Sequence, residues 1–165
     1  MDEHSFTRRT VIQAGVIGSA AAASPFAVAQ TTPQPGALTT APTSQSGLSP
    51  RLTMHAIDTF HGTPGTGMKC DLSVLEGDKY RPIKSVTTAE SGRTAEPLLV
   101  DDALKAGRYE LLLYFEEYFQ KWKVQLPTPN FLKTVPVRFV IQDTTQRYHL
   151  PILFTPWGYS YYRGS

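Results

Sequence analysis

From residue 51 onward, apolar and polar side chains alternate along most of the chain with a period of two, which is the pattern of a half-buried β-strand. In the first segment Leu52, Met54 and Ala56 share one face, and the opposite face carries His55. Turn-forming Gly, Pro, Asn and Asp residues separate the segments. The pattern predicts about eight strands: 52–57, 68–74, 83–88, 98–100, 109–115, 135–142, 148–155 and 159–163.

One segment follows helical spacing instead. Phe115, Tyr118, Phe119 and Trp122 stand at positions i, i+3, i+4 and i+7, with charged and amide side chains between them. This spacing predicts a helix of about two turns. We expect its aromatic stripe to pack on a sheet, because so short a helix forms only with tertiary contacts. Eight short strands and one helix predict an all-β fold, a two-sheet antiparallel sandwich.

The first thirty residues have the pattern of an export signal. Arg8-Arg9 precede an apolar, Ala- and Gly-rich run over 11–23, and Ala27-Val28-Ala29 follows. The run of about 13 residues is shorter than the roughly 20 that cross a bilayer, so a removable signal is favoured over a stable membrane span. The paired arginines resemble a twin-arginine signal. We expect cleavage near Ala29 or Gln30 and export to the periplasm.

Residues 31–50 carry no charged side chain and are rich in Thr, Pro, Ser, Gln and Gly. They contain too little apolar surface to offset the entropy lost on ordering. The sequence therefore predicts three parts: a signal peptide over 1–30, a disordered linker over 31–50 and a folded domain over 51–165. The domain has an ordinary size for a single core.

Composition excludes several classes of function. The 165 residues include 16 Lys and Arg against 14 Asp and Glu, a net charge of +2. This balance is too even for a protein whose main partner is nucleic acid or an acidic membrane surface. The single cysteine, Cys70, can form no disulfide within the chain and no thiolate cluster. Its place in the alternation predicts a core position.

Three histidines lie in the predicted domain, namely His55, His61 and His149. His55 and His149 each interrupt an apolar strand, so each either finds a hydrogen-bond partner in the core or lines an opening. His61 stands in a turn. Three histidines could hold a zinc ion, but a strand residue and a turn residue lack the fixed geometry of two histidines one helical turn apart. We therefore expect no metal, and without a phosphate loop or a Gly-x-Ser-x-Gly elbow in the sequence we expect no cofactor.

The carboxyl end is the other unusual feature. Tyr162, Arg163, Gly164 and Ser165 end the sequence inside a strand-like segment. Chain ends normally fray unless they are fixed. A fixed end would hold a guanidinium, a hydroxyl and a carboxylate in place as a site, whereas a surface strand that simply stops would not.

Three segments resemble the 5-hydroxyisourate hydrolases, the transthyretin-related enzymes of urate breakdown. They are LTMHAIDT at 52–59, TTAESGR at 87–93 with PLL at 97–99, and YHLPILFTP at 148–156 with the terminal Tyr-Arg-Gly-Ser. The terminal tetrapeptide is the most specific element, because transthyretin, the hormone carrier on the same fold, lacks it. Ala89 and Ser91 stand where the family is expected to have Asn and Asp.

The resemblance implies a transthyretin-like sandwich that assembles as a homotetramer with sites at subunit interfaces and uses no cofactor. The implied reaction opens the ring of 5-hydroxyisourate to 2-oxo-4-hydroxy-4-carboxy-5-ureidoimidazoline with a histidine-activated water. By position, the catalytic residues are His55, Arg93 and His149, and the substrate-binding residues are Tyr162, Arg163, Gly164 and Ser165. Either histidine can be the base.

Two other functions stay open at this stage. A transthyretin-like small-molecule binding or carrier module of the cell envelope would need an apolar channel and no activating base. A structural β-module, tethered by residues 31–50, would need no convergent polar site. Paired histidines and two arginines favour the hydrolase.

Overall fold

The computed structural model describes residues 49–164. The predicted signal peptide, nearly all of the predicted linker and Ser165 lie outside these residues. Within 49–164, no helix is long and apolar enough to cross a membrane.

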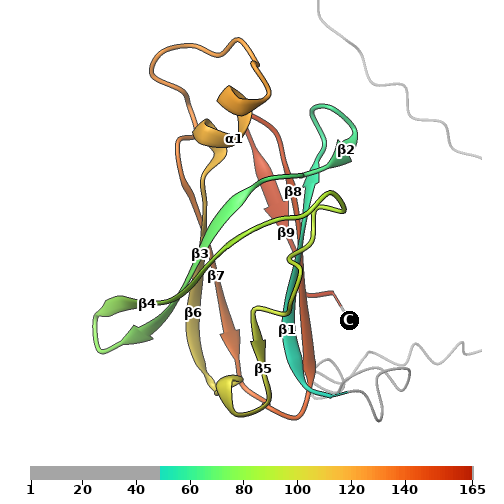
Figure 1. Ribbon diagram of the computed structural model, residues 1–165. Helices are drawn as coiled ribbons and strands as arrows, with labels where there is room; N and C mark the ends of the chain where they lie inside the picture. The colour runs from blue at the N-terminus through green and yellow to red at the C-terminus, as the bar shows by residue number, and fades with distance from the viewer. Residues whose placement is uncertain (1–48, 165) are drawn as a thin grey trace, which may run out of the picture.

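Two β-sheets pack face to face, and one short helix lies at an end of the sandwich (Figure 1). The first sheet has the order β2-β1-β8-β9, with β5 paired to the start of β1. Its strands are β1 (Arg51–Asp58), β2 (Thr63–Pro64), β5 (Leu99–Val100), β8 (Arg147–Phe154) and β9 (Tyr159–Tyr161). The second sheet has the order β4-β3-β6-β7, with β3 (Lys69–Glu76), β4 (Lys79–Thr87), β6 (Gly107–Leu113) and β7 (Val135–Ile141). A 3₁₀ turn (Asp101–Ala103) follows β5, and α1 (Phe115–Lys121) joins β6 to β7.

The predicted all-β sandwich is confirmed, with two differences in the first sheet. A ninth strand exists because Thr63–Pro64, in a segment predicted as a turn, pairs with the end of β1. The sheet is also not wholly antiparallel, because β1 and β8 run parallel over their whole length. Parallel pairing joins segments far apart in the sequence, and the local alternation of residues carries no signal for it.

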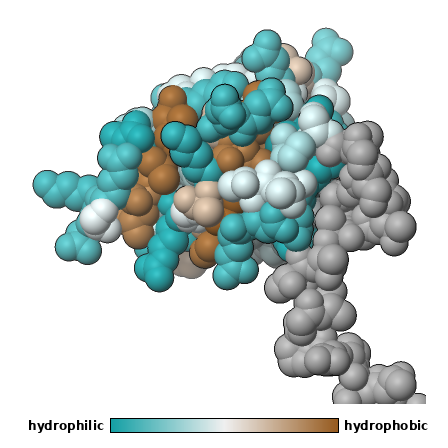
Figure 2. Space-filling model, turned by 90° about the horizontal axis from the view of Figure 1, so that it is seen from below, coloured by the Kyte–Doolittle hydropathy of each residue, from teal (hydrophilic) through white to brown (hydrophobic). Residues whose placement is uncertain are grey.

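The alternation predicted for β1 fills the core. Leu52, Met54 and Ala56 are at most 1% exposed and face the second sheet, where Cys70 and Leu72 are fully buried. Burying one aliphatic side chain contributes about 1.5–3 kcal/mol. Polar side chains cover most of the end opposite α1, and apolar ones show only between them (Figure 2). The inner face of β1 therefore stabilises the fold and leaves its outer face available for chemistry.

Helix α1 closes the other end of the core. Phe115, Tyr118 and Phe119 are buried, and all three rings pack against Phe154 of β8. The prediction was wrong for Trp122, which is 50% exposed. The helix ends at Lys121, so Trp122 is its C-cap and has left the buried stripe.

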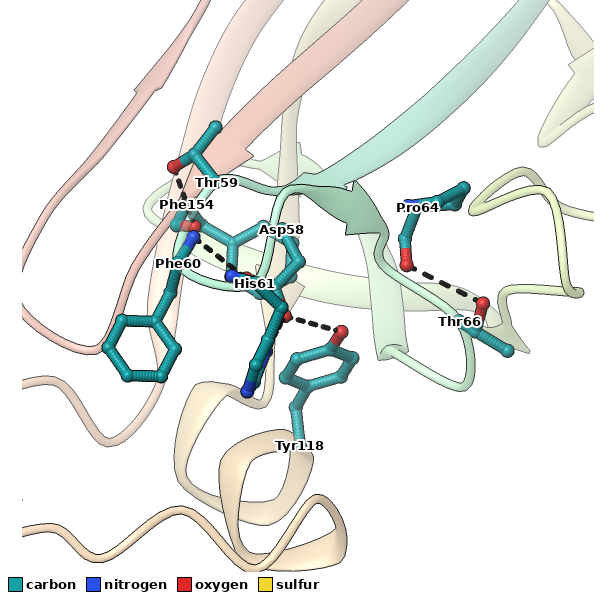
Figure 3. A network of polar contacts seen from close by, with 8 residues as sticks. All are labelled: Asp58, Thr59, Phe60, His61, Pro64, Thr66, Tyr118 and Phe154. Carbon is teal, nitrogen blue, oxygen red and sulfur yellow. Dashed lines mark hydrogen bonds and ion pairs between the residues drawn. The ribbon is translucent and has the colours of Figure 1, made fainter.

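Asp58, the last residue of β1, ties α1 to the first sheet. Its fully buried carboxylate accepts hydrogen bonds from the backbone N–H of Phe60 (2.9 Å) and His61 (3.0 Å), and from the Tyr118 hydroxyl (2.9 Å). His61 Nδ1 lies 2.6 Å from the same carboxylate, and Figure 3 shows Tyr118 reaching toward it from the helix. A buried carboxylate is tolerated only with such partners. His61, predicted as a turn residue, is therefore a structural partner of Asp58.

Tyr118→Phe is expected to lower the free energy of unfolding by about 1–3 kcal/mol, because it removes one hydrogen bond to a buried carboxylate and keeps the ring. Burial and Asp58 raise the pKa of Tyr118, so the hydroxyl donates at neutral pH. Urea unfolding measures the change. The matched control is Tyr114→Phe, whose hydroxyl binds the partly exposed Asp71, and a change below about 1 kcal/mol is expected there. Equal stability of wild type and Tyr118→Phe would contradict this role.

Candidate active site

A cavity of about 630 Å³ opens on the outer face of the first sheet. Strands β1 and β8, the loop before β5 and the segment after β9 supply its walls, and the C-terminal end of the described chain lies beside β8, where Gly164 forms a β-bridge with His149. The lining residues are His55, Ile57, Arg93, His149, Pro151, Tyr162, Arg163 and Gly164. The structure thus brings together six of the seven residues that the sequence singles out, and Ser165 lies outside the described residues.

The parallel pairing of β1 with β8 positions the two histidines. Both point outward, because their neighbours in the alternation fill the core. The register pairs Thr53 with His149 and His55 with Pro151, so the histidines are diagonal neighbours. Their ring centroids lie 6.4 Å apart. A ligand or a water molecule in the cavity can therefore meet both imidazoles.

A turn that lies against β1 carries Arg93 into the cavity. The Ala56 N–H donates to the Gly92 carbonyl at 2.8 Å. Gly92 has φ +72°, and a Cβ atom there would lie 2.3 Å from the Ala56 carbonyl oxygen, so only glycine fits. The next residue forms a β-bridge with His55, and the Arg93 guanidinium lies 3.3 Å from His149 Nε2.

The segment after β9 is held in place by contacts of Arg163 and Gly164. The Gly164 N–H donates to the His149 carbonyl at 2.8 Å. The Arg163 guanidinium stacks on the ring of the buried Tyr148, 4.7 Å from its centroid, and donates to the side-chain carbonyl of Gln146. The resemblance implies that Arg163 binds substrate. The contacts with Tyr148 and Gln146 give it a second role, which is to anchor the segment after β9.

The environment lowers the pKa of both histidines. For His55 the main cause is burial, followed by the Arg93 charge, while a hydrogen bond with the Ser91 backbone acts in the opposite direction. For His149 the causes are burial, then Arg93, then His55, then Arg147. Both rings are therefore neutral near pH 7, and each has a nitrogen that can accept a proton.

Charge in the cavity has one sign. Two guanidiniums contribute to the lining, and none of the described lining residues is acidic. Such a site favours a ligand that is anionic or rich in carbonyl oxygens. Within residues 49–164 no group of three His, Cys, Asp or Glu side chains could hold a metal ion. Burial raises the pKa of Cys70 to about 12, so this thiol is not a nucleophile.

The sequence did not single out three residues that shape the site. Ile57 and Pro151 form apolar parts of the wall, and Thr53 contacts His149 from behind the cavity. The period-two pattern puts Thr53 and Ile57 on the face of His55, so a signal for both was present. The same pattern puts Pro151 on the face of His149, but the meeting of both faces in one cavity depends on the register between β1 and β8.

The HIUase/Transthyretin family model matches residues 52–164. The 5-hydroxyisourate hydrolase 2 of Rhizobium meliloti (strain 1021) is 46% identical over 122 residues, which is 74% of this chain and 99% of the relative. The solved structure of Klebsiella pneumoniae 5-hydroxyisourate hydrolase is similar with a TM-score of 0.57 and 31% identity, covering 70% of this chain and 94% of that one. A crystal structure of (S)-allantoin synthase is similar with a TM-score of 0.67 and 32% identity, covering 71% of this chain and 44% of that one.

Proposed function

Because the chain belongs to the HIUase/Transthyretin family, we propose that it hydrolyses 5-hydroxyisourate, as the names of its relatives state for them. The observation that carries the proposal is the convergence of two imidazoles and a guanidinium in one open cavity. A carrier of apolar ligands needs none of these groups.

Ring opening needs a base, a proton donor and a group that stabilises an oxyanion. Water attacks a ring acyl carbon of the substrate, the adjacent C–N bond breaks, and the departing nitrogen receives a proton. The products of these steps are a carboxylate and a ureido group, as in 2-oxo-4-hydroxy-4-carboxy-5-ureidoimidazoline. The step requires no redox or carbon-transfer cofactor, because neither the oxidation state nor the number of carbon atoms changes.

We assign the base to His149. An arginine N–H can only donate, so its contact with His149 Nε2 puts a lone pair on that nitrogen at the cavity side. When the guanidinium of Arg93 turns to a substrate carbonyl, this lone pair is free to take a proton from water. His55, with its ring centroid 6.4 Å from that of His149, orients the water or the substrate.

The cavity also suits the shape and charge of the substrate. A flat, carbonyl-rich bicyclic molecule fits in about 630 Å³. Arg93 can donate two N–H groups to oxygens of the substrate. Tyr162, 57% exposed at the rim, offers an aromatic face.

We further propose a homotetramer in which each cavity opens at a subunit interface. The cavity is lined in part by residues from the C-terminal end, and the nearby rings of Tyr159, Tyr161 and Tyr162 are 41%, 41% and 57% exposed. Exposed aromatic side chains are enriched at protein interfaces. Light scattering coupled to gel filtration would give four times the protomer mass, and a monomer at micromolar concentration would contradict the proposal.

Periplasmic localisation after signal cleavage is a separate proposal, supported by the arginine pair and the short apolar run in the sequence. Mass spectrometry of protein from the periplasmic fraction should find a chain that starts near Gln30. A chain that still starts at Met1 would contradict it.

The direct test of function is the decay of 5-hydroxyisourate freshly made by urate oxidase, followed by absorbance with and without the protein. A hydrolase accelerates the decay at substoichiometric concentration. A carrier would slow it or leave it unchanged, and a structural module would do nothing. Either of these two results would reject the proposed activity.

Adding residues after Ser165 is expected to lower activity at least tenfold, because misplacing groups at a site by about 1 Å can cost a hundredfold. Gly164 lines the cavity and is bound to the His149 backbone, so added chain must leave from the site itself. The melting temperature should change little, because Gly164 lies outside the core. The control carries the same tag at the N-terminus of the chain that starts near Gln30. Equal activity of the two tagged proteins would contradict the expectation.

A further inference from the structure

Thr53 contacts His149 at the ring nitrogen that does not face Arg93. Its hydroxyl oxygen lies 2.8 Å from His149 Nδ1 and 3.4 Å from the Tyr148 carbonyl oxygen. The side chain is partly buried and does not line the cavity. Thr53 lines a second, smaller cavity of about 110 Å³ that Arg93 also borders. We therefore expect its effect on a substrate in the first cavity to pass through its contact with His149.

The donors and acceptors around the ring determine where its proton sits. A guanidinium has only N–H donors, so His149 Nε2, 3.3 Å from Arg93, must be the acceptor. In a neutral imidazole the other nitrogen then carries the hydrogen. The Nδ1–H donates to the Thr53 oxygen, and the Thr53 hydroxyl donates to the Tyr148 carbonyl.

The opposite tautomer would leave the network unsatisfied. An Nε2–H group would face an N–H of Arg93, and two donors in contact repel each other. In that tautomer Nδ1 has no hydrogen and accepts from the Thr53 hydroxyl, so the Tyr148 carbonyl loses the Thr53 hydroxyl as a donor. The arrangement with Nδ1–H is the one in which each donor meets an acceptor.

We propose that Thr53 is a positioning residue that holds His149 in the Nδ1–H tautomer and so directs the Nε2 lone pair into the cavity. Strand register places the two residues side by side, since Thr53 pairs with His149 across β1 and β8. A β-branched side chain in a strand also has restricted rotation, which fixes the hydroxyl. The consequence for rate rests on the proposed function, whereas the tautomer does not.

Three variants separate this role from a structural one. Thr53→Val keeps the shape of the side chain and removes the hydroxyl, and Thr53→Ser keeps the hydroxyl. The matched control is Thr59→Val. The hydroxyl of Thr59, the residue after β1, also donates to a carbonyl of β8, that of Phe154, at 3.0 Å. Thr59 does not line the cavity.

The first measurement is nitrogen NMR of the full chain labelled with ¹⁵N-histidine near pH 7, with the His149 signals identified by their loss in His149→Ala. We expect wild type, Thr53→Ser and Thr59→Val to show a protonated Nδ1 and an unprotonated Nε2. Thr53→Val should show exchange between tautomers or the opposite one. The second measurement is turnover of 5-hydroxyisourate, where Thr53→Val should lower kcat about tenfold with little change in KM, and the other two variants should stay within about twofold of wild type.

An Nε2–H tautomer in wild-type protein overturns the proposal, even if Thr53→Val does not fold. So does a Thr53→Val variant whose His149 signals and kcat equal those of wild type. If wild type does not accelerate substrate decay but shows the Nδ1–H tautomer, which Thr53→Val loses, the proposed function fails and the assignment of Thr53 stands.

Discussion

His149→Ala is expected to turn over 5-hydroxyisourate about 10²–10⁴-fold more slowly than wild type and to keep its fold, because a positioned general base contributes a factor of this size. The side chain lies on the outer face of β8, so its removal opens no cavity in the core. His55→Ala should lower turnover by a similar factor. Steady-state assays with circular dichroism melting curves on both variants measure rate and fold together.

The matched control for both variants is His61→Ala. His61 lies between β1 and β2 of the same sheet, where it contacts Asp58 and does not line the cavity. We expect its loss to lower stability and to leave turnover near the wild-type value. Wild-type turnover in both His55→Ala and His149→Ala would end the assignment of the catalytic histidines.

The local pattern of residues was enough to predict the faces of the strands. Period two correctly separates the buried Leu52, Met54 and Ala56 from the outward His55, and it places Cys70 in the core. Helical spacing correctly predicts α1, although the helix stops one residue before Trp122. Such predictions succeed because they depend only on which face of a helix or strand a side chain lies on.

The assembly of the site could not be derived from these patterns. Thr53 and His149 are 96 residues apart, and their contact depends on the parallel pairing of β1 with β8. The position of Arg93 depends on a backbone contact between Gly92 and Ala56 that a side chain at position 92 would block. Arg93 was predicted as a site residue through the family resemblance alone, because a single arginine in a turn belongs to no repeating pattern.

The role of Arg163 depends on tertiary contacts, which the local pattern of residues does not encode. The sequence places Arg163 beside the site but says nothing of its partners. Its stacking on Tyr148 and its bond to Gln146 hold the backbone of Gly164 against His149. Within residues 49–164, Arg93 is thus the guanidinium in the cavity that contacts a candidate catalytic group.

Arg93→Ala is expected to lower kcat/KM about 10²–10³-fold, the usual loss when an oxyanion donor is removed. It should also move the pH profile. Arg93 lowers the pKa of His55 and His149, so its removal raises both. A base works in its unprotonated form, and the rate therefore rises with pH through this pKa. The acidic limb of the profile should move to higher pH, toward the ordinary histidine value of about 6.5.

Arg93→Lys separates charge from geometry. Lysine keeps the positive charge, so the acidic limb should stay close to its wild-type position. It lacks the planar fork of N–H groups that a guanidinium offers to substrate oxygens, so the rate should still fall, by at least about tenfold. Arg81→Ala, which removes an exposed arginine paired with Glu76 where β3 turns into β4, is the matched control and should change neither quantity. If Arg93→Ala has the wild-type rate and the acidic limb of its pH profile does not move, this guanidinium neither lowers the pKa of the histidines nor contacts the reacting carbonyl.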